Sequence, residues 1–417
     1  MQVVILAGGK GTRIASIARD IPKPMIPVAG KPVLEWQIEL ARRYGFRDFL
    51  LMTGYLGDCI ESYFGDGSRW GAHIDYYREP EPLGTAGALQ HVRERLEEEF
   101  WVFYGDTVMD FDMEAMLAFH HAHRADATLF LHPNDHPYDS DLVRIGEDSL
   151  VTAFLPKPRP EGEAQRNLVN AALYILRKDC LDYLNGGKAD FGRDIFAPML
   201  SDGKRIAGYV SAEYIKDMGT PERWEAVGKD IASGKVARLN RRNPRPCIFL
   251  DRDGVLNREV NLLSRPEQLE LLPGAAQAVR AINQSGYLAV VVTNQPQIAR
   301  NLCSIEELRG IHDRLETLLG AEGAYLDAIY YCPHHPDKGY PEERPEYKID
   351  CNCRKPKPGM LLQAARDLHI DLSASYMIGD SPRDVGAGEA AGVKQSFQIE
   401  TNQPGALQEL VELLLSA

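Results

Sequence analysis

The sequence has no long hydrophobic run and no excess of basic residues. No stretch approaches the ~18 consecutive apolar residues of a membrane span, and no basic leader precedes the first apolar segment. With 47 Lys and Arg against 60 Asp and Glu, the formal net charge is -13. Nucleic acids and membrane surfaces are bound by basic faces, so the composition predicts neither as a partner.

Cysteine is also scarce. Only seven of the 417 residues are cysteine, an odd number, and three of them fall between positions 332 and 353. This usage is typical of a reducing compartment and of a metal cluster, and it argues against a disulfide framework. We therefore expect a cytoplasmic protein.

The length of the chain predicts two domains, since one domain usually takes roughly 150 residues. Residues 233–246 are polar and basic and end in Pro-Arg-Pro, as is typical of an exposed linker. We therefore place one domain at residues 1–232, the linker at 233–246 and a second domain at 247–417.

The first domain opens with a strand-like apolar segment, residues 2–7, that runs into Gly-Gly-Lys-Gly-Thr-Arg at residues 8–13. Its glycines allow backbone N–H groups to close on a polyphosphate, and its cations add charge. The spacing fits neither a Walker loop nor the dinucleotide pattern. Prolines on both sides of Lys23 then present its ammonium group from a stiff loop. Together these features predict a phosphate site.

Gly-Gly-x-Gly-Thr-Arg with a Pro-Lys-Pro loop resembles the sugar-1-phosphate nucleotidyltransferases, and the resemblance extends over residues 1–230. It implies a GT-A-like three-layer α/β domain with a mixed sheet, a nucleoside triphosphate as donor and Mg²⁺ as cofactor. Asp106 and Asp217 match the family's Mg²⁺ ligands, and Arg13 and Lys23 match its catalytic cations. The positions matched to substrate binding are Gly8, Gly9, Gly11, Thr12, Glu79, Gly84, Thr85, Lys157 and Asn170.

This assignment agrees with the chemistry, because nucleotidyl transfer chiefly requires positioning and charge neutralisation. Each side chain taken alone is as easily a helix cap or a solvated charge, but five in the expected order favour a site. Pro156 and Ala172 depart from the family pattern, in which Glu and Gly are common, so the sugar stays open. Glu79 could accept two hydrogen bonds from guanine, which favours GTP.

A cluster of histidines between residues 120 and 136 invites a metal site. His120, His121 and His123 fall near the end of a helix-like segment, residues 113–124, where a cationic end interacts favourably with the helix dipole. No cysteine lies nearby. A solvated helix face is therefore the favoured interpretation.

The second domain opens with an apolar strand that ends in Asp-Arg-Asp at residues 251–253. Such a strand delivers both carboxylates to the carboxyl edge of a parallel sheet, where open α/β folds bind their ligands. One Asp can attack a phosphorus atom while the other moves a proton.

The motif resembles the haloacid dehalogenase superfamily of phosphatases, which implies a Rossmann-like parallel sheet between helices. Asp251 then forms the aspartyl-phosphate and Asp253 acts as acid and base. Three later positions match further parts of that site: Thr293 as the phosphoryl-binding hydroxyl, Lys355 as the neutralising cation, and Asp380 as the Mg²⁺ ligand beside Asp251 and the Asp253 carbonyl.

Two tight pairs, Cys332 with His334 and Cys351 with Cys353, can close a tetrahedron around Zn²⁺. A site ligated entirely by protein is structural, and this one would hold the segment that carries Lys355. His335 is a competing ligand, and free thiols are the less favoured alternative.

The zinc loop narrows the family. Asp-Arg-Asp-Gly-Val-Leu-Asn with Cys-Pro-His-His-Pro and Cys-x-Cys-Arg-Lys-Pro resembles the heptose 1,7-bisphosphate 7-phosphatases, with histidinol-phosphate phosphatases as relatives. The resemblance implies that Arg354 contacts the retained phosphate, and Asn294 is a further substrate-binding candidate. Departures at Pro296-Gln297 and in the loop 338–350 bear on substrate preference.

The two resemblances imply consecutive reactions. The second domain would remove the 7-phosphate of D-glycero-D-manno-heptose 1,7-bisphosphate, and the first would join heptose 1-phosphate to a nucleotide, with GDP-heptose favoured over ADP-heptose. One alternative is a mannose or hexose 1-phosphate guanylyltransferase fused to a phosphatase of other specificity, such as a histidinol-phosphate-like one. Another is that one domain is a silent regulatory module. The oligomeric state stays open, a homo-oligomer included.

Overall fold

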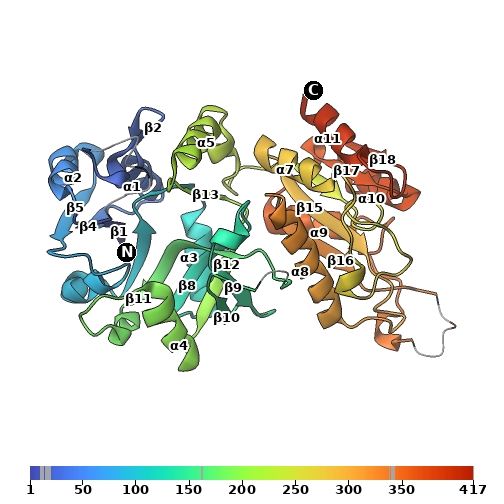
Figure 1. The fold of residues 1–417 in the computed structure, drawn as a ribbon, viewed down its shortest axis with the longest axis horizontal. Coiled ribbons are helices and arrows are strands. Elements are labelled where there is room, and N and C mark those ends of the chain that lie inside the picture. Colours follow the sequence, from blue (N-terminus) through green and yellow to red (C-terminus); the bar gives the residue numbers. More distant parts are fainter. Residues whose placement is uncertain (10–13, 15–19, 161–162, 338, 340–342, 417) are drawn as a thin grey trace. The chain divides into compact units, whose positions relative to one another are not determined.

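The structure is a computed structural model that describes residues 1–9, 14, 20–160, 163–337, 339 and 343–416. The chain forms two compact units (Figure 1). The first comprises Met1–Leu131, Val143–Leu155 and Asn170–Asn240, and the second comprises His132–Leu142, Pro156–Val169 and Arg241–Ala417. Among the described residues, no helix has the length and apolar character needed to cross a membrane.

A mixed nine-stranded sheet forms the centre of the first part of the chain. Strand β1 (Gln2–Ala7) lies between β4 (Asp48–Thr53) and β6 (Glu99–Tyr104), parallel to both. Strand β11 (Val169–Arg177) runs antiparallel to β6. The other strands of this sheet are β5 (His73–Arg78), β8 (Ala127–His132), β9 (Leu142–Ile145), β10 (Val151–Leu155) and β12 (Ile206–Val210).

Short two-stranded ribbons and helices complete this part. The ribbons pair β2 (Pro27–Val28) with β3 (Lys31–Pro32) and β7 (Thr107–Asp110) with β13 (Tyr214–Asp217). The α-helices are α1 (Val33–Arg43), α2 (Gly57–Phe64), α3 (Met113–His123), α4 (Ala197–Ser201), α5 (Pro221–Ala232) and α6 (Lys235–Arg238).

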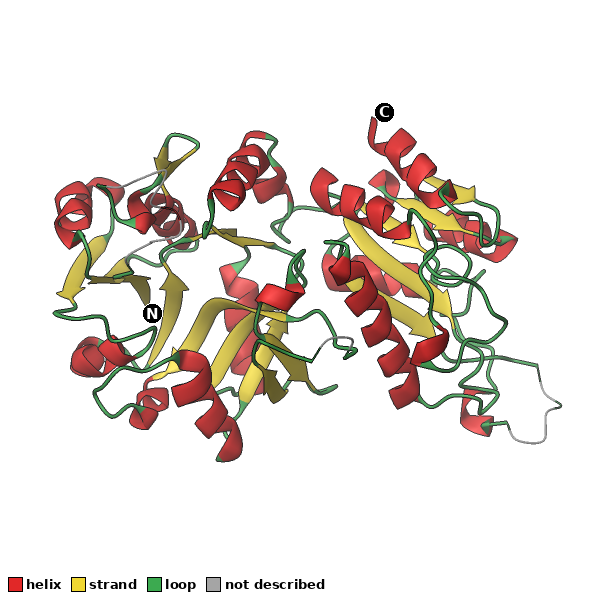
Figure 2. Cartoon of the chain, in the orientation of Figure 1, coloured by secondary structure: helices red, strands yellow, loops and turns green. Residues whose placement is uncertain are grey.

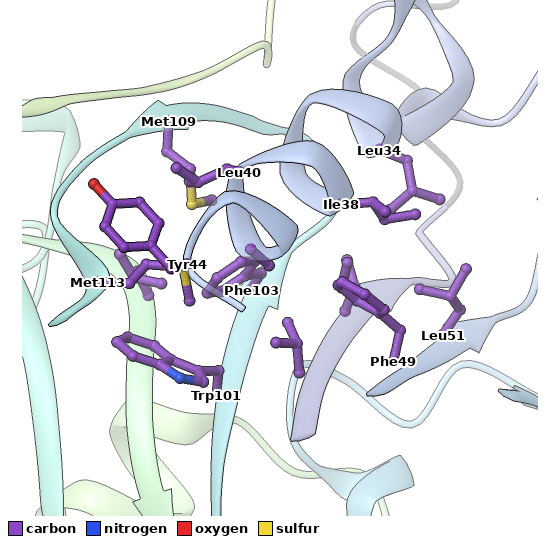
Figure 3. Close-up of a cluster of buried hydrophobic side chains, with 14 of the residues drawn as sticks. Leu34, Ile38, Leu40, Tyr44, Phe49, Leu51, Trp101, Phe103, Met109 and Met113 are labelled. Carbon is purple, nitrogen blue, oxygen red and sulfur yellow. The ribbon is translucent and has the colours of Figure 1, made fainter. Parts of the chain in front are cut away.

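The core of the first unit is built by α1 against the sheet. Leu34 and Ile38 of α1 lie four residues apart and therefore share one helix face. They belong to one buried cluster with Phe49 of β4 and with Trp101 and Phe103 of β6 (Figure 3). Burial of this apolar stripe holds the glycine-rich end of β1 in a fixed frame.

A parallel five-stranded sheet forms the second unit, in the order β16-β15-β14-β17-β18, with helices on both faces (Figure 2). Its central strand β14 is fully buried, as expected for a strand covered on both faces. The strands are β14 (Cys247–Leu250), β15 (Leu288–Asn294), β16 (Ala328–Cys332), β17 (Tyr376–Gly379) and β18 (Gln395–Gln398), and the helices are α7 (Ala275–Ser285), α8 (Ile305–Ala321), α9 (Gly359–Leu368), α10 (Pro382–Ala391) and α11 (Ala406–Ser416).

The strand order places a topological switch point at β14. The chain continues from β14 to β15 and β16 on one side, and then returns to β17 and β18 on the other. In open α/β sheets the ligand crevice lies at such a point, outside the carboxyl ends of the strands. The carboxyl end of β14 carries the Asp-Arg-Asp motif. The two predicted three-layer α/β folds, one with a mixed sheet and one with a parallel sheet, are confirmed.

The predicted exposed linker is partly ordered and partly buried. It contains α6, and Asn240, 4% exposed, donates to Asp110 Oδ1 at 2.7 Å. Arg245, 2% exposed, donates through Nε to the Leu368 carbonyl at the end of α9 at 3.0 Å. A cation at a helix carboxyl end satisfies carbonyls that have no partner within the helix. The expectation of an exposed segment was therefore wrong at these positions.

The prediction of a solvated histidine face was also wrong for His120. Its side chain is 1% exposed and its Nδ1 lies 2.8 Å from the Thr128 hydroxyl. Burial lowers the pKa of His120 to about 4, against the opposing effect of Glu99. His121, in contrast, is exposed and lies 2.9 Å from Glu99. Because His120 reaches Thr128 of β8 while His121 is exposed, the last turn of α3 has both a buried and a solvated histidine.

Two candidate active sites

The candidate phosphatase site begins where β14 ends. The backbone N–H of Asp251 continues the strand by donating to the Ile378 carbonyl at 2.9 Å. Gly254 follows with φ +80°, and a Cβ at this glycine would lie 2.3 Å from a carboxylate oxygen of Asp380. The glycine is therefore required both by the backbone conformation and by the approach of Asp380. The ends of β14 and β17 thus bring Asp251 and Asp380 together.

A buried lysine pairs with two acidic side chains of this site, and a third carboxylate lies close to them. Lys355 Nζ lies 2.9 Å from Asp251 and 2.5 Å from Asp384. Single carboxylate oxygens of Asp251, Asp380 and Asp384 lie within 4.8 Å of one another. Such an oxygen set fits a hard divalent cation such as Mg²⁺. Asp384 was missed by the sequence analysis, although it lies only four residues after Asp380, in the first turn of α10.

The charges of these groups are strongly coupled. Burial raises the pKa of Asp251, Lys355 opposes that rise, and the carboxylate of Asp384 adds to it. Burial also raises the pKa of Asp384, but the charge of Lys355 and hydrogen bonds from Lys355 and Ser381 outweigh it, so its pKa lies below the usual value. Asp384 is therefore the firmly ionised partner of Lys355.

Asp253 is held by a separate set of side chains. Arg252, fully buried, donates through Nη2 to Asp253 Oδ2 at 2.8 Å. Asn257 and Gln295 each donate to Asp253 at 2.9 Å, and Gln295 Nε2 also lies 2.8 Å from the Thr293 hydroxyl. Burial raises the pKa of Asp253, but the Arg252 charge and these hydrogen bonds outweigh it and lower that pKa. The roles of Arg252 and Gln295 were missed, because neither residue type signals chemistry by itself.

Asn294, a substrate-binding candidate, hydrogen-bonds to the backbone of the lysine segment. Its Oδ1 accepts from the Lys355 backbone N–H at 3.0 Å, and its Nδ2 donates to the Lys355 carbonyl at 3.1 Å. This pair of bonds attaches the end of β15 to the residue that reaches Asp251. Asn294 therefore positions Lys355 in this structure.

The predicted zinc ligands form one compact group. Ligand atoms of Cys332, His334, Cys351 and Cys353 all lie within 4.8 Å of one another. Hydrogen bonds with Cys332, Cys351 and His334 lower the pKa of Cys353 against the opposing effect of burial, which favours a thiolate. Two pairs of sulfur and imidazole donors at this separation fit Zn²⁺. His335 is outside the group.

The thiol group is connected to the phosphatase site through the chain. Arg354 directly follows Cys353 and donates through Nη1 to the His334 carbonyl at 3.1 Å. Lys355 comes next and pairs with Asp251. A metal that fixes the loop would therefore also fix the two cations of this segment.

The candidate transferase site lies where β7 and β13 pair. Asp217 at the end of β13 is in register with Thr107, and the next residue, Met218, donates its N–H to the Asp106 carbonyl at 2.9 Å. The backbone segments that carry Asp106 and Asp217 are therefore hydrogen-bonded neighbours, and carboxylate oxygens are ligands that suit a divalent cation. Lys23 contacts the Asp106 carboxylate.

The glycine-rich segments on this side pack closely. A Cβ at Gly8 would lie 2.9 Å from a carboxylate oxygen of Glu79, so Glu79 covers the end of β1. Burial raises the pKa of Glu79, and the hydrogen bond from the Leu83 N–H opposes that rise. Gly84 has φ +81°, and its Cβ would lie 2.3 Å from the Ala189 carbonyl oxygen. Gly84 is thus required for backbone packing, whatever it contacts in a substrate.

Thr85 and Asn170 are linked through buried tyrosines. The Thr85 hydroxyl donates to Asp190 at 2.8 Å and also hydrogen-bonds to Tyr104, which in turn pairs with Tyr174. Asn170 hydrogen-bonds to Tyr174. Thr85 and Asn170, both matched to substrate binding, are therefore linked by one chain of hydrogen bonds.

Ala172, where a glycine was expected, has φ +56°. This left-handed conformation favours glycine, which explains why glycine is common at the position. Lys157 belongs to a segment of the second unit, where its Nζ donates to the Asp139 carbonyl at 2.6 Å. Gly9 is exposed, with open space around its Cα. Gly11, Thr12 and Arg13 lie outside the described residues.

Comparison with known proteins decides the family of the first domain. Residues 2–234 match the nucleotidyl transferase family. The chain belongs to this family. A mannose-1-phosphate guanylyltransferase of Mycobacterium tuberculosis is 36% identical over 237 residues, which cover 56% of this chain and 65% of that protein. The chain therefore spans less than two thirds of the length of this nucleotidyltransferase relative.

A second family matches the later part of the chain. Residues 195–392 match the haloacid dehalogenase-like hydrolases. A D-glycero-beta-D-manno-heptose-1,7-bisphosphate 7-phosphatase of Pasteurella multocida is 42% identical over 158 residues, which cover 38% of this chain and 83% of that protein. Among solved structures, HddC from Yersinia pseudotuberculosis complexed with GMP-PN matches 55% of this chain and 99% of its own at 28% identity and a TM-score of 0.48. The predicted fusion of a nucleotidyltransferase with a haloacid dehalogenase-like phosphatase is confirmed.

Proposed function

We propose that the two domains catalyse consecutive steps in the synthesis of a nucleotide-activated heptose. The observation that carries the proposal is one chain that joins a nucleotidyltransferase to a close relative of heptose bisphosphate 7-phosphatases. Removal of the 7-phosphate from heptose 1,7-bisphosphate leaves heptose 1-phosphate, the type of acceptor that a sugar-1-phosphate nucleotidyltransferase uses. The domain boundary falls within residues 233–246.

In the phosphatase step, the Asp251 carboxylate attacks the phosphorus atom and the bond to the sugar oxygen breaks. Asp253, which must first take up a proton because its pKa is lowered in the structure, donates that proton to the oxygen and later accepts a proton from the water that hydrolyses the aspartyl-phosphate. Lys355 neutralises charge beside Asp251, and Thr293 holds the phosphoryl group. Asp251, Asp380 and the Asp253 carbonyl would hold Mg²⁺, which would supply further charge neutralisation. Asp384, within reach of the same ion, orients Lys355.

In the transferase step, an oxygen of heptose 1-phosphate attacks the α-phosphorus of the nucleotide, and pyrophosphate leaves. Asp106 and Asp217 hold Mg²⁺, which neutralises the phosphates. Arg13 and Lys23 stabilise the developing charge. Glu79 accepts hydrogen bonds from guanine, which makes GTP the preferred donor. The raised pKa of the half-buried Glu79 carboxylate supports this assignment, because hydrogen bonds from guanine would stabilise its charged form.

The quartet of Cys332, His334, Cys351 and Cys353 holds a structural zinc ion in this proposal. Its thiols and imidazole support the assignment, since soft thiolate ligands select zinc. Thiols must stay reduced to bind the metal, which is consistent with a cytoplasmic location.

The test incubates the purified protein with heptose 1,7-bisphosphate, Mg²⁺ and each of the four NTPs, with products followed by mass. Phosphate release followed by GDP-heptose is expected. Asp251→Asn should make neither product unless heptose 1-phosphate is supplied, and Asp106→Asn should release phosphate only. Turnover of mannose 1-phosphate with no turnover of heptose 1-phosphate would refute the heptose assignment, and a better donor than GTP would refute the role of Glu79.

A further inference from the structure

Asp217, the candidate metal ligand on β13, is engaged by a neighbouring arginine. Arg223 Nη1 lies 2.8 Å from Asp217 Oδ1 and 2.9 Å from Oδ2, between the two carboxylate oxygens. Both side chains are partly buried, at 21% and 35% exposure. A nitrogen that contacts both oxygens covers the face of the carboxylate on which a metal ion would also bind.

The position of Arg223 is determined by the helix that carries it. Thr220 caps α5 at its amino end, and its hydroxyl accepts from the Arg223 N–H at 3.4 Å. Three residues therefore separate the end of β13 from the capped turn. The first turn of α5 thus aims Arg223 back at Asp217, and the contact follows from local chain geometry.

Among the described side chains, each candidate metal ligand contacts one cation. Asp106 and Asp217 contribute two negative charges, while Lys23 and Arg223, which contact them, contribute two positive charges. A bare divalent cation would leave this group with net charge +2, which is costly in a partly buried site. A divalent cation bound to a nucleoside triphosphate carries about two negative charges and gives the two side-chain cations new partners.

We propose that Arg223 makes metal binding by Asp106 and Asp217 depend on the nucleotide. The guanidinium competes with a divalent cation for Asp217, and the phosphates of the incoming nucleotide draw it away. Arg223 is thus a positioning residue that rests on the proposed nucleotidyl transfer. It favours the metal–nucleotide complex over the metal alone.

The test compares wild type with Arg223→Gln in two binding measurements. The first is Mn²⁺ binding without nucleotide, followed by titration calorimetry and by the electron paramagnetic resonance of free Mn²⁺. The second is binding of the preformed Mn²⁺–GTP complex without sugar phosphate, so that no turnover occurs. All proteins carry Asp380→Asn and Asp251→Asn, which neutralise two of the three carboxylates of the phosphatase site, and are loaded with zinc beforehand.

Loss of Arg223 should move the two affinities in opposite directions. Arg223→Gln should bind Mn²⁺ alone about fivefold more tightly, the factor expected for a partly exposed ion pair, and should bind Mn²⁺–GTP about fivefold more weakly. Arg223→Lys should restore both affinities towards wild type. A matched control is Arg193→Gln, because Arg193 also pairs with an aspartate, Asp194, at 2.9 and 2.7 Å but outside the site.

The outcomes separate this inference from the proposed function. If Arg223→Gln binds Mn²⁺ with the same affinity as wild type, or binds both Mn²⁺ and Mn²⁺–GTP more weakly, Arg223 does not compete with the metal. Neither result would contradict nucleotidyl transfer. Failure of the wild type to bind Mn²⁺–GTP at all would overturn the proposed function and the inference together. The unfolding midpoint followed by tryptophan fluorescence confirms that each variant is folded, since Trp224 is adjacent in α5.

Discussion

Asp384 offers the sharpest test of the phosphatase site, because its role is visible only in the structure. Its side chain is 1% exposed, lies in the first turn of α10, and accepts from Lys355 Nζ at 2.5 Å and from the Ser381 N–H at 3.0 Å. Asp384→Asn keeps the size and one acceptor oxygen but removes the negative charge. Lys355 then has Asp251 as its remaining carboxylate partner among the described contacts.

The magnitude follows from the bond that is lost. A buried hydrogen bond to a charged group contributes about 1.5–3 kcal/mol, which corresponds to roughly 10- to 150-fold in rate if the bond positions Lys355 in the transition state. One of the three carboxylates that surround the metal position also becomes neutral. We therefore expect the phosphatase kcat to fall at least about tenfold and the Mg²⁺ requirement to rise.

The assay measures phosphate release across a range of Mg²⁺ concentrations, with nucleotidyl transfer by the same preparation as an internal control. Glu389→Gln provides a matched control, because Glu389 is an exposed acid on the same helix. Phosphatase activity within threefold of wild type at every Mg²⁺ concentration would refute the role of Asp384. Parallel loss of transferase activity would indicate a general folding defect.

Three further predictions test the structure. The four tryptophans all lie in the first unit, so their fluorescence reports its unfolding in the intact chain. Gly45 has φ +84° and open space around its Cβ position, so Gly45→Ala should lower the free energy of unfolding by about 1–2 kcal/mol. Gly84→Ala should lower it by about 1–3 kcal/mol more, because the new Cβ would lie 2.3 Å from a carbonyl oxygen. Equal losses in the two variants would refute the close packing at Gly84. The pKa of His120 is about 4 in the folded protein, below its value in the unfolded chain, so the unfolded chain binds the proton more readily. The folded protein is therefore at its full stability above about pH 6.5, where the imidazole is neutral, and it loses stability as the pH falls towards 4. Between pH 7 and 5 wild type should therefore lose about 2 kcal/mol more than His120→Gln, and parallel losses would contradict this. The control variant Cys59→Ser should retain roughly one equivalent of zinc per chain, and Cys351→Ser should lose it. If both variants retain the zinc, the quartet is not the zinc site.

Much of the fold was predictable because its signals are local. The apolar run before Asp251 is a buried parallel strand, since only a strand covered on both faces is apolar at every position. The helix-like segment 113–124 is the helix Met113–His123, close to the predicted bounds, and the Asp112 side chain caps its first turn. The order of the motifs was likewise sufficient to identify both families.

Burial of polar residues was not predictable, because it depends on what packs against them. Arg245 lies in a polar segment and His120 lies beside other histidines, yet a carbonyl at the end of α9 is the partner of one and the Thr128 hydroxyl of β8 is the partner of the other. Sequence composition suggested solvent at both positions. Only the neighbours in space show that each has a buried hydrogen-bonding partner.

By itself the sequence determined the chemistry of the protein: which carboxylates, cations and thiols are present, and on which strand ends they lie. The tertiary structure alone decided how those groups pair. It places Asp384 against Lys355, Gln295 between Asp253 and Thr293, and Arg223 on Asp217. The physical reason is that a side chain's charge is a property of the residue, whereas its pKa, its partner and its access to a metal ion depend on groups brought close by chain folding.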